Sequence, residues 1–206
     1  RRSQLIRGAL ARTEKRLLLR QAPDGAARLE RTASYMDVAW QFGELTCAEA
    51  AAVLGWRYGG RDAFYDTAAD PEFAAEFTEP ALWRLRALES DRDVLLAVRD
   101  ARGEFAGFFA FQGSHERCVI GLGLAPALTG RSLGAGFVLA GLAFARRQWD
   151  VVCFSLEVAV FNRRAITVYE RLGFVEKGRV SRAAPELAGE TVEFIEMAVE
   201  SDGVAW

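Results

Sequence analysis

The sequence contains few of the residues on which many metal and redox sites depend. It has one histidine and three cysteines among 206 residues. Cys47, Cys118 and Cys153 are widely spaced, with neither a CxxC pair nor histidine partners at metal-ligand spacing. His115 follows a turn-like Gly-Ser pair, so a histidine-dependent triad would rest on one turn residue. We therefore expect no metal, and reduced core thiols at Cys118 and Cys153, which fits a cytoplasmic protein.

Long apolar runs and a large net charge are absent as well. No uninterrupted apolar run reaches the roughly 18 residues of a membrane span, so we expect no membrane partner. The content of 51% hydrophobic and 26% charged residues is typical of a globular chain and excludes a disordered one. A formal net charge of −2 with a pI near 5.6 gives no general reason to expect a nucleic-acid partner.

The charge is unevenly distributed along the chain. Residues 1–35 carry nine basic and three acidic side chains, whereas residues 36–206 carry 17 basic and 25 acidic ones. Three interpretations of the first segment are open: a basic arm for nucleic acid or anionic lipid, a transit peptide, or an extension outside the packed domain. We favour the extension, because chain termini often lie outside the packed fold. The sequence thus predicts a basic N-terminal extension over 1–35 and one domain over 36–206.

Periodicity and turn residues predict the elements of that domain. Thr46 and Glu49 form a capping-box pattern before an alanine-rich helix. The short turns between 93 and 126 predict an antiparallel meander, and the almost continuous apolar run at 151–160 predicts a buried central strand. The whole pattern predicts an α+β domain with one mixed sheet. Strands are expected over 36–45, 93–100, 104–113, 117–126, 151–160, 174–182 and 190–200, and helices after Thr46, around 81–89, over 128–149 and over 162–173.

A glycine-rich segment stands where a predicted strand ends and a long helix begins. It reads Thr129, Gly130, Arg131, Ser132, Leu133 and Gly134. Amides at a helix start lack intrahelical acceptors and lie at the positive end of the helix dipole, so this segment suits a pyrophosphate. It contains neither the dinucleotide motif GxGxxG nor a P-loop. The alternative is a glycine-rich helix entry that packs tightly on the sheet.

Glu157, Asn162 and Tyr169 form a second group. Asn162 is placed to cap the helix over 162–173, and Tyr169 lies two turns further on the same side. Glu157 lies on the preceding strand, so a carboxylate, an amide and a phenol can converge where the strand meets the helix. Alternatively, Tyr169 is an ordinary residue of an amphipathic helix and Glu157 is an edge charge.

The two segments, in this order and separation, resemble the GNAT superfamily of N-acetyltransferases, in particular its small bacterial members. The segment 162–174, NRRAITVYERLGF, resembles the second signature of that family, with Asn, Ala, Tyr and Gly-Phe in register. The segment 129–134 resembles its acetyl-CoA signature, Q/R-x-x-G-x-G/A, with two departures: Thr129 replaces Arg or Gln, and Ser132 replaces the first glycine. The resemblance covers roughly residues 36–200. It implies a GNAT fold, a mixed and mostly antiparallel central sheet splayed between the fourth and fifth strands and flanked by helices.

The resemblance also implies a mechanism, in which acetyl-CoA is the co-substrate and an amine attacks its acetyl group directly. Glu157 corresponds to a general base, acting through water, and Tyr169 to the general acid that protonates the departing thiolate. Gly121 and Gly123 would let the strand expected over 117–126 bulge and so accept the pantetheine arm of acetyl-CoA. The residues implied to bind the cofactor are Leu122, Gly123, Leu124, Thr129, Gly130, Arg131, Ser132, Leu133, Gly134 and Asn162. The alternative is a non-catalytic domain that binds CoA or acyl-CoA as a sensor or scaffold.

The acceptor is the least determined part of this prediction. Trp56, Tyr58, Phe64 and Tyr65 are candidates for an aromatic acceptor pocket, although such residues equally serve as core or loop anchors. Asp62, Asp66 and Asp70 would attract a cationic amine, or simply form a solvated acidic loop. We expect a small-molecule or peptide amine as the partner, no nucleic acid, and an oligomeric state that includes a homodimer among its alternatives.

Overall fold

The computed structural model describes residues 40–69, 71–78, 93–184 and 190–205. Within these residues a seven-stranded sheet has the order β1-β2-β3-β4-β5-β7-β6, and every neighbouring pair is antiparallel except β4 and β5. The α+β class with one mixed sheet is thereby confirmed. The strands are β1 (Gln41–Glu44), β2 (Val94–Arg99), β3 (Phe105–Gly113), β4 (Cys118–Leu124), β5 (Cys153–Ala159), β6 (Val175–Ala184) and β7 (Glu190–Glu200).

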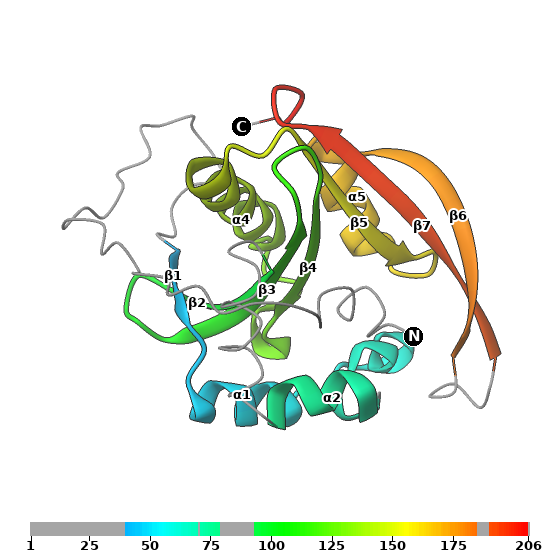
Figure 1. Ribbon diagram of the computed structural model, residues 1–206. Helices are drawn as coiled ribbons and strands as arrows, with labels where there is room; N and C mark the ends of the chain where they lie inside the picture. Colours follow the sequence, from blue (N-terminus) through cyan, green and yellow to red (C-terminus); the bar gives the residue numbers. More distant parts are fainter. Residues whose placement is uncertain (1–39, 70, 79–92, 185–189, 206) are drawn as a thin grey trace, which may run out of the picture.

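The sheet opens between β4 and β5. These parallel strands pair only at their first residues, Cys118 with Phe154 and Val119 with Ser155. β4 then continues to Leu124 beside β3, whereas β5 continues beside β7, so the two strands diverge toward their carboxyl ends (Figure 1). The predicted splay between the fourth and fifth strands is confirmed. Among the described residues, no strand therefore pairs with the facing edges of β4 and β5 beyond this point.

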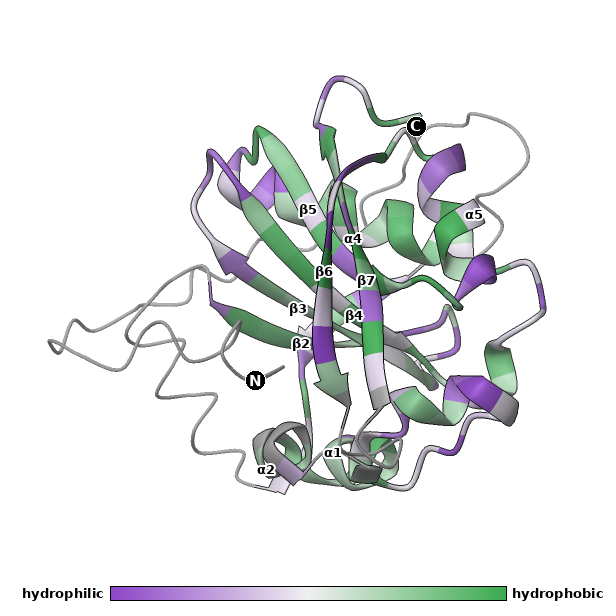
Figure 2. Ribbon diagram, turned by 90° about the vertical axis from the view of Figure 1, so that its right-hand side faces the viewer, coloured by the Kyte–Doolittle hydropathy of each residue, from purple (hydrophilic) through white to green (hydrophobic). Residues whose placement is uncertain are grey.

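Helices cover both faces of the sheet. Because successive side chains of a strand point to opposite faces, Phe108 and Phe109 of β3 enter different clusters. Phe109 packs in the main core with α4 (Gly134–Trp149) and α5 (Arg163–Arg171), and Phe108 packs with α1 (Cys47–Leu54) and α2 (Pro71–Thr78). Apolar residues predominate along β2 and β3 between these layers (Figure 2).

The sequence predicted most of these elements but missed two features. The capping box is confirmed, since Thr46 accepts from the Glu49 amide while Glu49 accepts from the Thr46 amide. The long helix was expected from residue 128, but α4 begins at Gly134, because Pro126–Leu128 forms a separate 3-10 turn. The helix α2 at 71–78 was not predicted, although Pro71 stands at its first position, where proline is well suited. The helix predicted around 81–89 lies outside the described residues, as does the basic extension over 1–35.

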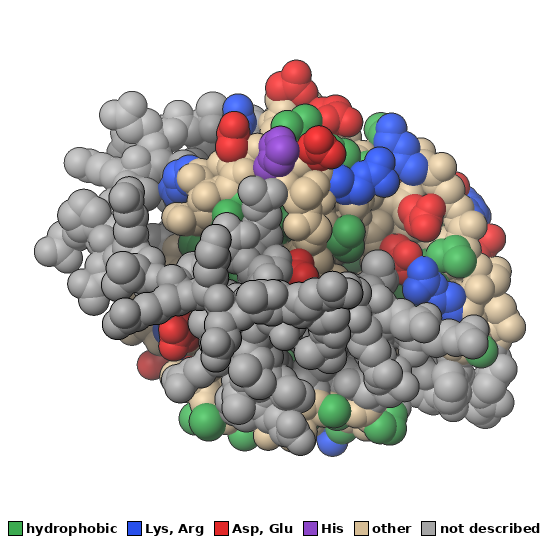
Figure 3. All heavy atoms as spheres, viewed as in Figure 1, with side chains coloured by type: hydrophobic (Ala, Val, Ile, Leu, Met, Phe, Trp, Pro, Cys, Tyr) green, Lys and Arg blue, Asp and Glu red, His purple; other side chains and the backbone are tan. Residues whose placement is uncertain are grey.

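The expected bulge in β4 is wrong. β4 pairs with β3 in unbroken register from Cys118 to Leu124. Gly123 has a packing role instead, because a Cβ there would lie 2.4 Å from the ring of Phe108. His115 occupies the predicted turn between β3 and β4, where it is exposed (Figure 3). None of the helices in the described ranges is long and apolar enough to cross a membrane.

Candidate active site

A cavity of about 540 Å³ lies where β4 and β5 diverge. Its walls are the second half of β4, the loop and first turn of α4, the end of β5, the helix α5, and the segment 56–67. The structure brings nearly all of the predicted site residues together around this one space. Those that line it are Trp56, Tyr58, Tyr65, Leu122, Gly123, Leu124, Thr129, Gly130, Ser132, Leu133, Gly134, Glu157, Asn162 and Tyr169.

Two predicted site residues do not line the cavity. Phe64 is 2% exposed and packs with Phe161 and Phe194, so it supports the wall from behind. Arg131 is exposed on the loop before α4 and does not face the cavity. The structure thus assigns Phe64 a packing position, and it leaves Arg131 at the outer rim of the glycine-rich segment.

The loop before α4 presents backbone amides rather than side-chain caps. Gly130 has φ +74° and Ser132 has φ +60°, and both values lie in the left-handed region. No side chain caps the start of α4, and the first amides of any helix lack intrahelical acceptors. The helix dipole adds partial positive charge at the same place. The segment therefore has the electrostatics of an anion site, and it reaches that state with a serine in a conformation that glycine adopts more easily.

Thr129, one of the residues implied to bind the cofactor, uses its hydroxyl within the protein. Its hydroxyl donates to the Pro126 carbonyl at 2.8 Å and so closes the 3-10 turn that precedes the loop. The hydroxyl hydrogen is therefore engaged within the protein, and only the oxygen lone pairs remain. The groups of this loop that remain open to an anion are the backbone amides and the Ser132 hydroxyl.

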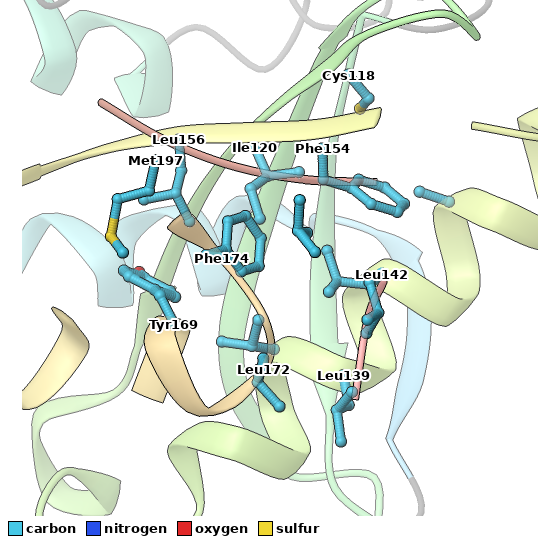
Figure 4. Packing of buried hydrophobic residues seen from close by; sticks show 14 of the residues in the cluster. Cys118, Ile120, Leu139, Leu142, Phe154, Leu156, Tyr169, Leu172, Phe174 and Met197 are labelled. Atoms are coloured by element: carbon cyan, nitrogen blue, oxygen red, sulfur yellow. The ribbon is translucent and has the colours of Figure 1, made fainter. Parts of the chain in front are cut away.

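Tyr169 is buried at the inner wall of the cavity. Its side chain lies beside Leu156 and Met197, and its ring centroid is 5.7 Å from that of Phe174 (Figure 4). Burial, and to a lesser degree Tyr65, raise the pKa of the Tyr169 phenol above its usual value. Within the described residues its hydroxyl makes no hydrogen bond. A protonated phenol without a protein acceptor in a cavity wall is available to a ligand.

Glu157 lies on β5 across the opening from α5. Its Oε1 accepts from Arg182 at 2.6 Å, and it is paired across the sheet with Glu196 of β7. Burial raises the pKa of Glu157 and the Glu196 charge raises it further, while the Arg182 charge lowers it; the net direction is upward. A carboxylate with a raised pKa is a better proton acceptor than an ordinary one.

Asn162 and the two tyrosines of the segment 56–67 hold the cavity walls in place. The Asn162 side chain accepts from the Ala165 amide at 3.2 Å, which confirms the predicted cap of α5. The Tyr58 hydroxyl donates to the Leu124 carbonyl at 2.9 Å, at the end of β4. The Tyr65 hydroxyl accepts from the Ala159 amide at 3.1 Å, at the end of β5. The aromatic segment thereby bridges the two strands that diverge.

Sequence reasoning missed two arginines that line the cavity, Arg164 and Arg182. Arg164 pairs with Asp62 at 2.5 Å, and Arg182 pairs with Glu157. A signal for Arg182 was present, because it lies two residues after Val180 on the same face of β6, opposite the buried Val192 of β7. A charged residue at an inward strand position indicates a specific partner. In the part of the chain that the structure describes, no three acidic, cysteine or histidine residues group to hold a metal ion.

Comparison with known proteins agrees with this arrangement. The structure of spermidine N-acetyltransferase from Vibrio cholerae in complex with CoA and spermine superposes with a TM-score of 0.63 at 16% identity, covering 80% of this chain and 96% of that one. At this identity the likeness is one of fold. A mycothiol acetyltransferase of Salinispora tropica is 35% identical over 115 residues, which cover 48% of this chain and only 37% of that relative. The sequence profile of the acetyltransferase (GNAT) family matches residues 61–174. Because that match takes in more than half of the 206 residues, the chain belongs to the acetyltransferase (GNAT) family.

Proposed function

We propose that the chain transfers the acetyl group of acetyl-CoA directly to an amine acceptor in this cavity. The observation that carries the proposal is the meeting of three groups around one space: the open amides before α4, the Glu157 carboxylate and the unpartnered Tyr169 hydroxyl. Family membership supports acetyl transfer as the reaction. The two relatives are named for mycothiol and for spermidine, so their names support the reaction and leave the acceptor open.

The walls of the cavity fit CoA. The amides of residues 130–134 and the helix dipole of α4 suit a pyrophosphate. Beyond Val119 no strand of the described ranges pairs with this edge of β4, so its backbone at Leu122 and Gly123 suits an extended, amide-bearing arm. The thioester of acetyl-CoA supplies an acetyl group that is already activated for attack by an amine.

Glu157 acts as the base in this proposal. An amine attacks only when neutral, whereas a lysine-type ammonium has a pKa of about 10.4 and an α-ammonium one of about 8. A proton must therefore leave the acceptor before or during attack. Glu157 lines the cavity with a carboxylate whose pKa is raised, and it takes that proton directly or through a water.

Tyr169 acts as the acid. An ordinary phenol has a pKa of about 10 and a thiol one of about 8.5, so proton transfer to a thiolate is uphill in water. Burial raises the pKa of a thiol as well as that of a phenol, so the transfer depends on holding the sulfur within hydrogen-bond distance of the Tyr169 hydroxyl. The raised pKa of Tyr169 keeps the phenol protonated at neutral pH, so it can donate its proton to a sulfur held beside it.

The second candidate is a CoA-binding domain without turnover. The departures from the family signature at Thr129 and Ser132 favour it, and the Thr129 hydroxyl is engaged within the protein. The test incubates the full chain with acetyl-CoA and a panel of amino acids, polyamines, aminoglycosides and peptides, and measures free thiol and acceptor mass. Acceptor-dependent thiol release with an acetyl mass increase is the expected result. Tight CoA binding without release on any acceptor would favour the second candidate.

A further inference from the structure

Two ion pairs line the acceptor side of the cavity, which is the part formed by the segment 56–67, β5 and β6. Asp62 pairs with Arg164 of α5 at 2.5 Å, and Glu157 of β5 pairs with Arg182 of β6 at 2.6 Å. All four side chains line the cavity, and their formal charges cancel. Asp62, one of the three acids that the sequence offered for a cationic acceptor, is therefore already neutralised by an arginine, whereas Asp70 lies outside the described residues.

Asp66, the next acid of the same segment, is also occupied. Its Oδ1 accepts from the Tyr58 amide at 2.7 Å, and its Oδ2 lies 4.0 Å from the Arg57 guanidinium. A polyvalent cation in the cavity would thus meet two arginines and no uncompensated carboxylate among the described lining residues. Charge balance disfavours a polyamine acceptor and favours one that carries charges of both signs.

Arg182 has hydrogen-bonding capacity to spare. A guanidinium has five N–H donors in a rigid fork, and Arg182 gives one of them to Glu157. No other hydrogen bond of Arg182 occurs within the described residues. Its side chain is 27% exposed and its guanidinium carbon lies 5.9 Å from the centroid of the Phe194 ring, so its remaining donors are partly shielded from solvent. Such a guanidinium is suited to a carboxylate, which it binds with two parallel hydrogen bonds.

We propose that the acceptor is an amine with a carboxylate close to its amino group, held with the carboxylate on Arg182 and the amine toward Glu157. The 2.6 Å contact between the two side chains requires that the two ligand charges also lie close together, as they do in an amino acid. The ligand zwitterion then lies antiparallel to the protein ion pair, so each charge faces its opposite. This assignment rests on the proposed acetyl transfer and names the acceptor class for it.

The experiment compares acceptors that differ only in the carboxylate. Phenylalanine, methionine and leucine are each assayed beside the carboxamide and the decarboxylated amine, with spermidine as the polyamine, on the wild type and Arg182→Gln. Loss of a charge-assisted contact is expected to lower kcat/KM for the amino acids about 10- to 100-fold. The amines should change far less. The readout is the ratio of kcat/KM for the amino acid to kcat/KM for its decarboxylated amine. An effect of the substitution on Glu157 changes both values and therefore cancels in this ratio.

Arg179→Gln is the matched control, since Arg179 lies on the same strand, pairs with Glu176 and Glu193, and does not line the cavity. It should keep the wild-type preference for the carboxylate. Thermal unfolding of both variants shows that they fold. The assignment is overturned if wild type prefers spermidine or the decarboxylated amines, or if Arg182→Gln lowers all rates equally. If the chain acetylates none of these amines, the proposed function is overturned instead. Calorimetric titration of wild type and Arg182→Gln with phenylalanine then tests the acceptor class by binding alone. Absence of Arg182-dependent binding overturns that class.

Discussion

Tyr169→Phe separates the chemistry of the site from its packing. The substitution removes one oxygen atom and leaves the ring in contact with Phe174. The Tyr169 side chain is 8% exposed, and its hydroxyl has no hydrogen-bond partner within the described residues. Removing a buried polar atom that lacks a partner costs no hydrogen bond, so the free energy of unfolding should stay unchanged or rise by about 1 kcal/mol.

The effect on turnover should be large. A positioned general acid contributes about 10²- to 10⁴-fold, so turnover should fall at least about 100-fold, or about 2.7 kcal/mol of activation free energy. The KM for acetyl-CoA should change little, because a phenol that acts only on the departing thiolate adds little to binding. Thiol release at saturating acceptor measures the first effect, and urea unfolding measures the stability.

Tyr65→Phe is the matched control, because it removes the same atom from a hydroxyl that has a partner. The Tyr65 hydroxyl accepts from the amide of Ala159, a residue with 0% exposure. Its loss leaves that amide unpaired and should lower the free energy of unfolding by about 1–3 kcal/mol. Two results would refute the reasoning: wild-type turnover in Tyr169→Phe, or a stability loss there equal to that of Tyr65→Phe.

Three further predictions follow from local geometry. Ser132→Gly should raise the free energy of unfolding in urea by about 0.5–1 kcal/mol, because glycine relieves the left-handed backbone strain at some entropic cost. Ser132→Ala keeps the strain and should not raise it, so equal gains in the two variants would contradict the prediction. The acetylation rate should fall as pH falls through the raised pKa of Glu157. Glu196→Gln removes a charge that raises this pKa while the Arg182 charge stays, so the fall in rate should move to lower pH. A move to higher pH would exclude Glu157 as the base. Iodoacetamide should add once to the native chain, at exposed Cys47, because the other two thiols are buried and burial raises the pKa of Cys118 to about 11; a second native adduct in the mass spectrum would contradict it.

The fold was largely predictable where local chemistry determines it. The capping box at Thr46, the asparagine cap at Asn162 and the short turns of the meander depend on neighbours in sequence, and the structure contains all of them. The start of α4 was placed six residues too early, because Pro126–Leu128 forms a separate 3-10 turn and the glycine-rich loop lies between this turn and the helix. Backbone angles such as the positive φ of Ser132 have no signature in periodicity.

By itself, the sequence determined which chemical groups are present and which element carries each of them. Strand alternation, helix periodicity and caps act over a few residues, and they suffice to place Glu157 on a strand and Tyr169 on the helix that follows. The tertiary structure alone decided which side chains meet. Asp62 and Arg164 are 102 residues apart and Glu157 and Arg182 are 25 apart, so only the path of the splayed sheet brings each pair into contact. Since local periodicity holds no information on such separations, the charge balance of the cavity follows from the fold and not from the composition.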